Sequence, residues 1–378
     1  MKRTGYWWLI AFLLTLIISC ADEDIVIENE EDFQEFLTEE MDLQNIPALS
    51  VLIFQDNNIL YESYLGQSNL EQQIDLQDDH MFLLASVSKV ITATALMQLY
   101  DIGAIELEDE INDYLDFPVN VPGQNVPVTF QMLLTHSSGI ADGPSLDDQY
   151  YYGEDSPIAL GEFLEDYLVP GGQYYDQDEN FYDFRPGTVH EYSNVGTALI
   201  AYLVEKISGQ EFNAYCQSEI FDPLNMSNSF WRLEDALQAG IVAQPYDWDD
   251  NENRVIDHYT FTDYPNGGMR STARDLFQVL KAFVLRGESN GYQLLSSNSI
   301  ELMTAPQIPA INNEVGLHLF LLDADEELWG HDGGEQGVAT IVAFNKETKV
   351  GAIVLSNQGE ADLEEILLAS YQLGILIK

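Results

Sequence analysis

The chain has 378 residues, of which 46% are hydrophobic and 11% aromatic, so it can bury a sizeable core and is not an acidic disordered tail. Its 14 Lys and Arg residues face 64 Asp and Glu residues, which gives a formal net charge of -50 at pH 7. A field of that sign repels phosphate backbones and anionic lipid headgroups, which argues against nucleic-acid binding and against electrostatic docking on membranes.

The N-terminus has the order of a secretory signal. Lys2 and Arg3 precede an apolar run from Tyr6 to Ile18. This run is shorter than the roughly 20 residues that a membrane-spanning helix needs, so cleavage of the segment is favoured over a permanent anchor. The sequence Ile17-Ile18-Ser19-Cys20 resembles a bacterial lipobox, which implies a lipid on Cys20. An ordinary signal peptide is the alternative.

These features divide the chain into three predicted parts. Residues 1–20 are expected to be a lipoprotein signal peptide, residues 21–40 an acidic tether, and residues 41–378 the folded domain. We expect an exported bacterial lipoprotein, in the periplasm or at the cell surface, that meets the membrane only through its lipid. With Cys20 lipidated, Cys216 has no partner for an intramolecular disulfide, and we expect it to be a buried filler in a helix.

Strand and helix patterns open the folded domain. Two apolar, partly β-branched runs flank Asp56-Asn57-Asn58, which predicts a hairpin from residue 46 onward. A helix is expected from Ser86 to about Tyr100, because apolar residues recur on one face and Gly103 follows the last of them.

The rest of the chain separates a helical region from a second group of strands. Helical stretches broken by Pro, Gly and Asp/Tyr-rich loops occupy about residues 106–263 and predict an inserted, mainly helical subdomain. Strand patterns return at 318–322, 338–345 and 349–357, before a final helix over 362–373. This order predicts an α/β fold, with one sheet built from both chain ends and flanked by helices.

Ser86 and Lys89 form the first candidate for a catalytic pair. They lie three residues apart at the predicted helix start, so both side chains are on one face. A helix start also offers backbone N–H groups to an oxyanion. Lys89 is the only lysine between Lys2 and Lys206, which argues against a solvating role. The alternative is Ser86 as a helix cap, with Lys89 extending to solvent.

Two later segments carry further candidates. Tyr192-Ser193-Asn194 lies directly before an apolar helix over 195–207. Tyr264-Pro265-Asn266 has the same spacing, but it leads into Gly267-Gly268 and is interpreted as a loop that packs against a site. His331-Asp332-Gly333-Gly334 is predicted to be a Gly-rich turn before the strand from Val338, where glycine lets the backbone approach a ligand closely.

The chain carries three motifs in order: Ser-x-x-Lys, then Tyr-x-Asn, then a basic residue followed two places later by Gly. This set resembles the motifs of the serine β-lactamase, D,D-peptidase and family VIII esterase group, which includes class C β-lactamases and penicillin-binding proteins. The likeness covers about Ile46 to Leu373. It implies a β-lactamase/transpeptidase-like fold with an antiparallel sheet and a helical insertion at about residues 106–263. Supporting stretches are Leu133–Gly139, Asp222–Met226, Gly267–Thr272 and Trp329–Gly337.

The resemblance also implies a role for each motif residue. Ser86 would attack an acyl carbonyl and form an acyl-enzyme. Lys89 and Tyr192 would share the proton handling, with either a neutral lysine or a phenolate as the base. Asn194 would orient the amide or ester oxygen of the substrate. The N–H groups of Ser86 and Gly334 would form the oxyanion hole.

The third motif departs from the β-lactamase pattern. His331 stands where those enzymes usually have lysine, and with a reference pKa of about 6.5 it need not be charged at neutral pH. Arg270 is the alternative cation for a substrate carboxylate, unless it pairs with a structural carboxylate, and Gly333 is expected to contact substrate. Peptidases and esterases of the group often have histidine here, which favours these activities over a dedicated β-lactamase.

We therefore expect a serine hydrolase that cleaves a small ester, a peptide or a β-lactam-like amide without a cofactor. The histidines show no metal-binding spacing, so no catalytic metal is expected. His136 is interpreted as a packed loop histidine rather than a base. The rival interpretation is a catalytically silent protein that binds cell-wall peptides or another acylated ligand. Retention of Ser86, Lys89, Tyr192 and Asn194 together argues against it.

Overall fold

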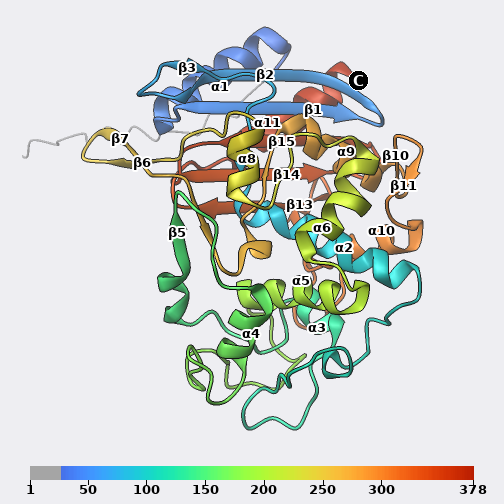
Figure 1. Ribbon diagram of the computed structural model, residues 1–378. Coiled ribbons are helices and arrows are strands. Elements are labelled where there is room, and N and C mark those ends of the chain that lie inside the picture. The colour runs from blue at the N-terminus through green and yellow to red at the C-terminus, as the bar shows by residue number, and fades with distance from the viewer. Residues whose placement is uncertain (1–26) are drawn as a thin grey trace, which may run out of the picture.

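A seven-stranded sheet is the frame of the protein in the computed structural model, which describes residues 27–378 (Figure 1). Cys20 and the predicted signal peptide lie outside the described residues. The strand order is β12-β13-β14-β15-β1-β2-β3. The strands are β1 (Ala48–Gln55), β2 (Asn58–Asn69), β3 (Ile74–Asp75), β12 (Phe320–Asp323), β13 (Leu328–Glu335), β14 (Val338–Phe344) and β15 (Val350–Ser356).

Both ends of the chain meet at the centre of this sheet. β1 pairs antiparallel with β15, in a register that places Leu49 opposite Ser356 and Gln55 opposite Val350. On its other side β1 forms the predicted hairpin with β2. Every neighbouring pair in the sheet is antiparallel. The predicted α/β fold, with an antiparallel sheet built from both chain ends, is confirmed.

Helices cover both faces of the sheet because successive strand residues point to opposite sides. Leu49, Val51 and Ile53 of β1 pack in a cluster with α1 (Glu30–Gln44) and α11 (Glu364–Ile377). Leu52 and Phe54 belong to the larger core, which includes α2 (Ser88–Asp101) and α9 (Ala273–Val284).

The prediction of an acidic tether over residues 21–40 is wrong for the second half of that range. Residues 30–44 form α1, in which Phe33 and Leu37 are fully buried. The Asn29 side chain accepts hydrogen bonds from the N–H groups of Glu31 and Asp32 and so caps the helix start. Acidic residues in the first turn are favourable there because they complement the helix dipole. Negative charge is thus compatible with a docked, amphipathic helix.

The region predicted as a mainly helical insertion, about residues 106–263, contains several helices, but turns and loops make up most of it and short strands also occur. Figure 1 shows α2 between the sheet and the part of this region formed by residues 130–208. The helices of the whole region are α3 (Phe130–Leu134), α4 (Leu160–Leu168), α5 (Asn194–Ser208), α6 (Phe212–Cys216), α7 (Asp222–Leu224) and α8 (Leu233–Ala239), and α10 (Ser297–Met303) follows later.

Four small two-stranded sheets complete the fold. They pair β4 (Phe82–Leu83) with β9 (Arg270–Ser271), β5 (Tyr150–Tyr152) with β8 (Tyr259–Phe261), β6 (Tyr246–Asp249) with β7 (Glu252–Val255), and β10 (Glu288–Ser289) with β11 (Tyr292–Gln293). Cys216 is buried in α6, as predicted. None of the helices between residues 27 and 378 has the length and apolar character needed to cross a membrane.

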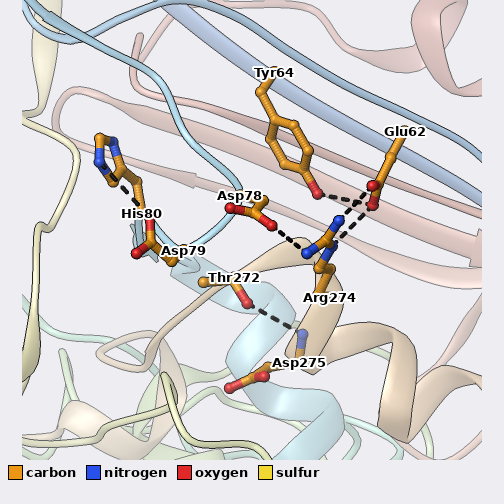
Figure 2. Close-up of polar contacts among 8 residues, drawn as sticks. All are labelled: Glu62, Tyr64, Asp78, Asp79, His80, Thr272, Arg274 and Asp275. Atoms are coloured by element: carbon orange, nitrogen blue, oxygen red, sulfur yellow. Dashed lines mark hydrogen bonds and ion pairs between the residues drawn. The ribbon is translucent and has the colours of Figure 1, made fainter.

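Arg274 ties α9 to the sheet (Figure 2). Its guanidinium donates hydrogen bonds to both carboxylate oxygens of Glu62 on β2 and to Asp78 in the loop before β4. Tyr64 donates a further hydrogen bond to Glu62, over 3.1 Å. Hydrogen bonding to Arg274 lowers the pKa of Glu62. The helix itself begins at a cap in which Thr272 Oγ1 accepts from Asp275 N over 3.1 Å.

Candidate active site

Ser86 lies on a short 3₁₀ turn, Ala85–Val87, that leads into α2. The predicted helix is confirmed, although its regular α part begins at Ser88. Ala85 has a φ of 46°, in the left-handed region that side chains other than glycine rarely adopt. This backbone geometry places Ser86 in a pocket at the junction of α2 and β13. Strain of this kind is characteristic of functional sites.

Lys89 is fully buried, and its ammonium nitrogen contacts three separate parts of the chain. Nζ donates to Ser86 Oγ over 3.0 Å, to Asn194 Oδ1 over 2.8 Å and to the Asn266 carbonyl over 2.6 Å. Burial lowers the pKa of Lys89 to about 7, while surrounding carboxylates, of which Asp142 has the largest effect, raise it. The helix-face prediction for Ser86 and Lys89 agrees with this contact.

Tyr192 closes the other side of the same cluster. Lys89 Nζ is 4.9 Å from the centre of its ring. Its buried hydroxyl lies near the Ser86 hydroxyl but makes no hydrogen bond of ordinary geometry within residues 27–378. Burial raises the pKa of Tyr192 above its usual range, and the neighbouring Ser86 hydroxyl offsets part of this rise. Tyr192 is therefore a protonated phenol at neutral pH.

The ring of Tyr192 packs against His136, which in turn packs against His318, and both histidines are buried. His136 lies 4.3 Å from Tyr192, centre to centre, and 4.4 Å from His318. Nδ1 of His136 accepts a hydrogen bond from Ser193 N over 3.2 Å. Burial lowers the pKa of both histidines well below the usual range. The prediction of a packed loop histidine at 136 is confirmed, and its contacts show that it positions the Tyr192 segment.

Asn194 is the first residue of α5, and Asp142 fixes it in place. The Asp142 carboxylate accepts from Asn194 N over 2.8 Å and from Val195 N over 3.0 Å. The side chain of Ser193 accepts from Gly196 N and caps the same helix end. Asn194 therefore presents its side-chain oxygen to Lys89.

The segment His331-Gly334 was predicted to be a turn, and this prediction is wrong. It forms the second half of β13, which pairs with β14 from Trp329 to Glu335. A Cβ added to Gly333 would lie 2.8 Å from Ser86 N and 2.7 Å from Leu84 O. Glycine at 333 is thus required for the close approach of β13 to Ser86, as the sequence suggested. Gly334 follows on the strand and lines the same pocket.

His331 is buried and uncharged at neutral pH. Its Nδ1 lies 2.5 Å from the carbonyl oxygen of Asp332. Because that oxygen can only accept, Nδ1 carries the proton in the neutral ring. Burial and the nearby charge of Lys89 lower the pKa of His331 to about 4. The expectation that this position supplies no fixed cation agrees with these surroundings.

Arg270 does not serve the substrate role predicted for it. Its guanidinium is buried and donates hydrogen bonds to the backbone carbonyls of Gly268 and Tyr259. It is not among the residues that line the pocket of Ser86. Its partners are carbonyls rather than the structural carboxylate considered as the alternative. Arg270 instead holds the loop whose Asn266 carbonyl accepts from Lys89, and that loop does pack against the site as expected.

The pocket around Ser86 has a volume of about 370 Å³. No lysine or arginine is among its lining residues, which are Ser86, His190, Tyr192, Phe320, His331, Asp332, Gly333 and Gly334. Four carboxylates surround Lys89 and raise its pKa by their negative charge: those of Asp142, Asp263, Glu335 and Asp332. Across residues 27–378, no group of three or more His, Cys, Asp or Glu side chains is arranged to hold a metal ion.

Sequence reasoning missed two carboxylates of this site, Asp142 and Asp263. Asp263 accepts from Asn266 Nδ2 over 2.7 Å, and burial raises its pKa to about 7. Both residues lie in loops of a chain with 64 acidic residues, so neither stands out by composition. One sequence feature could have pointed to Asp142, because this residue closely follows the family-like stretch Leu133–Gly139.

The sheet, the helical insertion and the Ser-Lys-Tyr cluster between them define a serine hydrolase-type fold. The β-lactamase family model matches residues 33–373, and the chain belongs to this family. The resemblance inferred from the motifs is therefore confirmed.

Individual relatives are distant. Penicillin-binding protein 4 of Amycolatopsis lactamdurans is 28% identical over 344 residues, which is 88% of this chain and 85% of that protein. Protein flp of Staphylococcus aureus is 22% identical over 84% of this chain, and the match spans only 61% of flp.

Solved structures show the same fold. The octameric penicillin-binding protein homologue from Pyrococcus abyssi superposes with a TM-score of 0.72 and 25% identity, over 92% of this chain and 77% of that one. EstCE1, a hydrolase with promiscuous acyltransferase activity, superposes with a TM-score of 0.70 and 16% identity, over 91% of this chain and 97% of that one.

The two glycines of β13 allow a matched test of how Ser86 is positioned. Gly333→Ala would push against the Ser86 amide, whereas a Cβ at Gly334 would meet no atom within 4 Å. The Ser86 amide is a predicted donor of the oxyanion hole, and losing such a donor slows a reaction about 100-fold or more. We therefore expect Gly333→Ala to slow acylation of Ser86 by about that factor. Gly334→Ala should slow it much less. Stopped-flow acylation by an activated ester measures both. Equal losses would contradict the close-approach argument.

Proposed function

We propose that the protein hydrolyses small uncharged esters through an acyl-enzyme on Ser86. The observation that carries this proposal is the contact of a fully buried lysine, with its pKa lowered to about 7, to the serine oxygen at 3.0 Å. A serine hydroxyl is a weak nucleophile at neutral pH and needs an adjacent base. Lys89 is neutral in a substantial fraction of molecules at pH 7 and is in reach of that proton.

The proton transfers follow from the lowered pKa of Lys89 and the raised pKa of Tyr192. Lys89 takes the proton of Ser86 Oγ as the oxygen bonds to the substrate carbonyl carbon. The N–H groups of Ser86 and Gly334 stabilise the negative charge on the carbonyl oxygen. Tyr192, whose raised pKa keeps it protonated, donates its proton to the departing alcohol oxygen and regains one from Lys89. Water then attacks the acyl group by the same steps in reverse. Of the two bases left open by the motifs, these directions favour lysine.

The charges of the site favour an ester over a β-lactam or a peptide ending in a carboxylate. Lys89 is buried and engaged by three acceptors, His331 is neutral, and Arg270 is turned to backbone carbonyls. A substrate carboxylate would therefore find no counter-charge in the pocket and would face Asp332. Unpaired charges of one sign at short range oppose binding.

We also propose that a lipid on Cys20 tethers this domain to a membrane after export. Support comes from the lipobox-like sequence that ends at Cys20. In addition, α1 begins at Glu30, only a short way along the chain from Cys20. Few residues then separate the lipid from the docked helix, so the domain would be held close to the bilayer.

Intact mass spectrometry tests the hydrolase proposal. Residues 21–378 incubated with an activated acetate ester are expected to gain the mass of one acetyl group. The Ser86→Ala variant should gain none, and Ser218→Ala, which changes an exposed serine outside the pocket, should behave as the parent. A penicillin should acylate far more slowly than the ester. Absence of both acylation and turnover in the parent would instead support a silent binding protein.

Labelling with radioactive palmitate tests the tether. The full chain expressed in a bacterial host should carry label and partition with membranes, because a lipidated cysteine follows signal cleavage. Cys20→Ser should lose the label, and Cys216→Ser, which changes the buried cysteine of α6, should keep it. Label that persists in Cys20→Ser would refute the assignment.

A further inference from the structure

The backbone of Leu84, two residues before the nucleophile, is held from two sides. Leu84 N donates to the Met269 carbonyl over 2.8 Å, and the Leu84 carbonyl accepts from Thr340 Oγ1 over 2.6 Å. Met269 directly precedes β9, whereas Thr340 lies on β14 of the main sheet. The segment that leads into the Ser86 turn is therefore fixed to two separate parts of the fold.

Ala85 connects this fixed carbonyl group to the Ser86 amide. Because peptide groups are planar, only the φ and ψ rotations of Ala85 lie between the Leu84 carbonyl and the Ser86 N–H. The φ of Ala85 is 46°, which favours glycine over alanine. An alanine persists in such a conformation only where its surroundings impose it. If Ala85 relaxed to a negative φ, the Ser86 N–H would turn away from its present direction.

The register of the sheet places Thr340 for this contact. Thr340 is opposite Gly333 in the pairing of β13 with β14. A Cβ added to Gly333 would lie 2.6 Å from Thr340 Oγ1, and it would be almost as close to Leu84 O and to Ser86 N. These three atoms thus meet over the bare glycine. Thr340 is buried and has the one polar side chain of β14, so its hydroxyl is costly there unless it is hydrogen-bonded.

We propose that Thr340 is a positioning residue for the acylation of Ser86. Its hydroxyl holds the Leu84 carbonyl and so keeps Ala85 in the conformation that directs the Ser86 N–H towards the carbonyl oxygen of the substrate. The proposal rests on the ester hydrolysis proposed above. It deepens that function by adding a residue of the main sheet that acts only through the backbone before Ser86.

Thr340→Val tests the role of the hydroxyl, because valine keeps the shape of the side chain but cannot donate. In the folded domain, residues 21–378, we expect the single-turnover rate of acylation by an activated acetate ester to fall about tenfold or more. The ester concentration that gives half the maximal rate should change less than about twofold, because an oxyanion-hole donor acts mainly in the transition state. Thr340→Ser, which restores the hydroxyl, should recover the rate to within about threefold of the parent.

Two controls separate positioning from general damage to the site. The pH midpoint of acylation should stay at the parental value in Thr340→Val. The hydrogen bonds of Lys89 to Asn194 and Asn266 lie outside the changed contact, so its burial is preserved. Thr304→Val removes a comparable buried bond, from Thr304 Oγ1 to a carbonyl of α10 over 2.7 Å, and should leave acylation within about twofold of the parent.

Ala85→Gly tests the link between Thr340 and the backbone conformation. Glycine adopts a positive φ about as readily as a negative one, so the direction of the Ser86 N–H then needs less support from Thr340. In the Ala85→Gly background, Thr340→Val should therefore cost at most about threefold, compared with about tenfold in the parent. If Thr340→Val does not fold, Thr340→Cys replaces it in both backgrounds, because a thiol is only a weak donor.

The outcomes separate the two proposals. Acylation of Thr340→Val at the parental rate, or an equal loss in Thr340→Ser, would overturn the role of the hydroxyl. A loss that is the same with alanine and with glycine at position 85, or that comes with a shifted pH midpoint, would overturn the positioning role as well. Absence of Ser86 acylation in the parent would instead overturn the proposed hydrolysis.

Discussion

The burial of a single ammonium group is the constraint on which the site depends. Removing a charge from water costs several kcal/mol, so Lys89 is tolerated only because three acceptors from three segments surround its nitrogen. Two of these segments are held by further contacts. Asp142 caps the helix of Asn194, and Arg270 holds the loop of Asn266. The same burial that threatens stability lowers the pKa of Lys89 and so makes it available as a base at neutral pH.

Sequence reasoning identified the parts of this arrangement that depend on spacing along the chain. Ser86 and Lys89 are three residues apart, and a helical turn alone brings them together. Tyr192 and Asn194 flank a helix start, and the apolar runs at both chain ends indicated one sheet. Each of these features follows from local periodicity, which one sequence records well.

The features that were missed depend on contacts between distant segments. β13 contains three glycines and was interpreted as a turn, because its pairing with β14 and its closeness to Ser86 are not visible in its composition. α1 was interpreted as a tether because acidic residues masked its buried stripe of Phe33 and Leu37. Arg270 was expected to meet substrate because the sequence shows a charge but not its direction. Its carbonyl partners come from the surrounding loop and from β8.

The pH dependence of Ser86 acylation, measured in single turnovers of an activated ester, tests the central claim most directly. If neutral Lys89 is the base, the rate rises with pH through a midpoint near 7, where the buried ammonium loses its proton. Asp263→Asn removes a carboxylate that raises this pKa, so the midpoint should move to lower pH. A midpoint near the ordinary lysine or tyrosine value of about 10, or a rising limb that disappears in Asp263→Asn, would contradict the account.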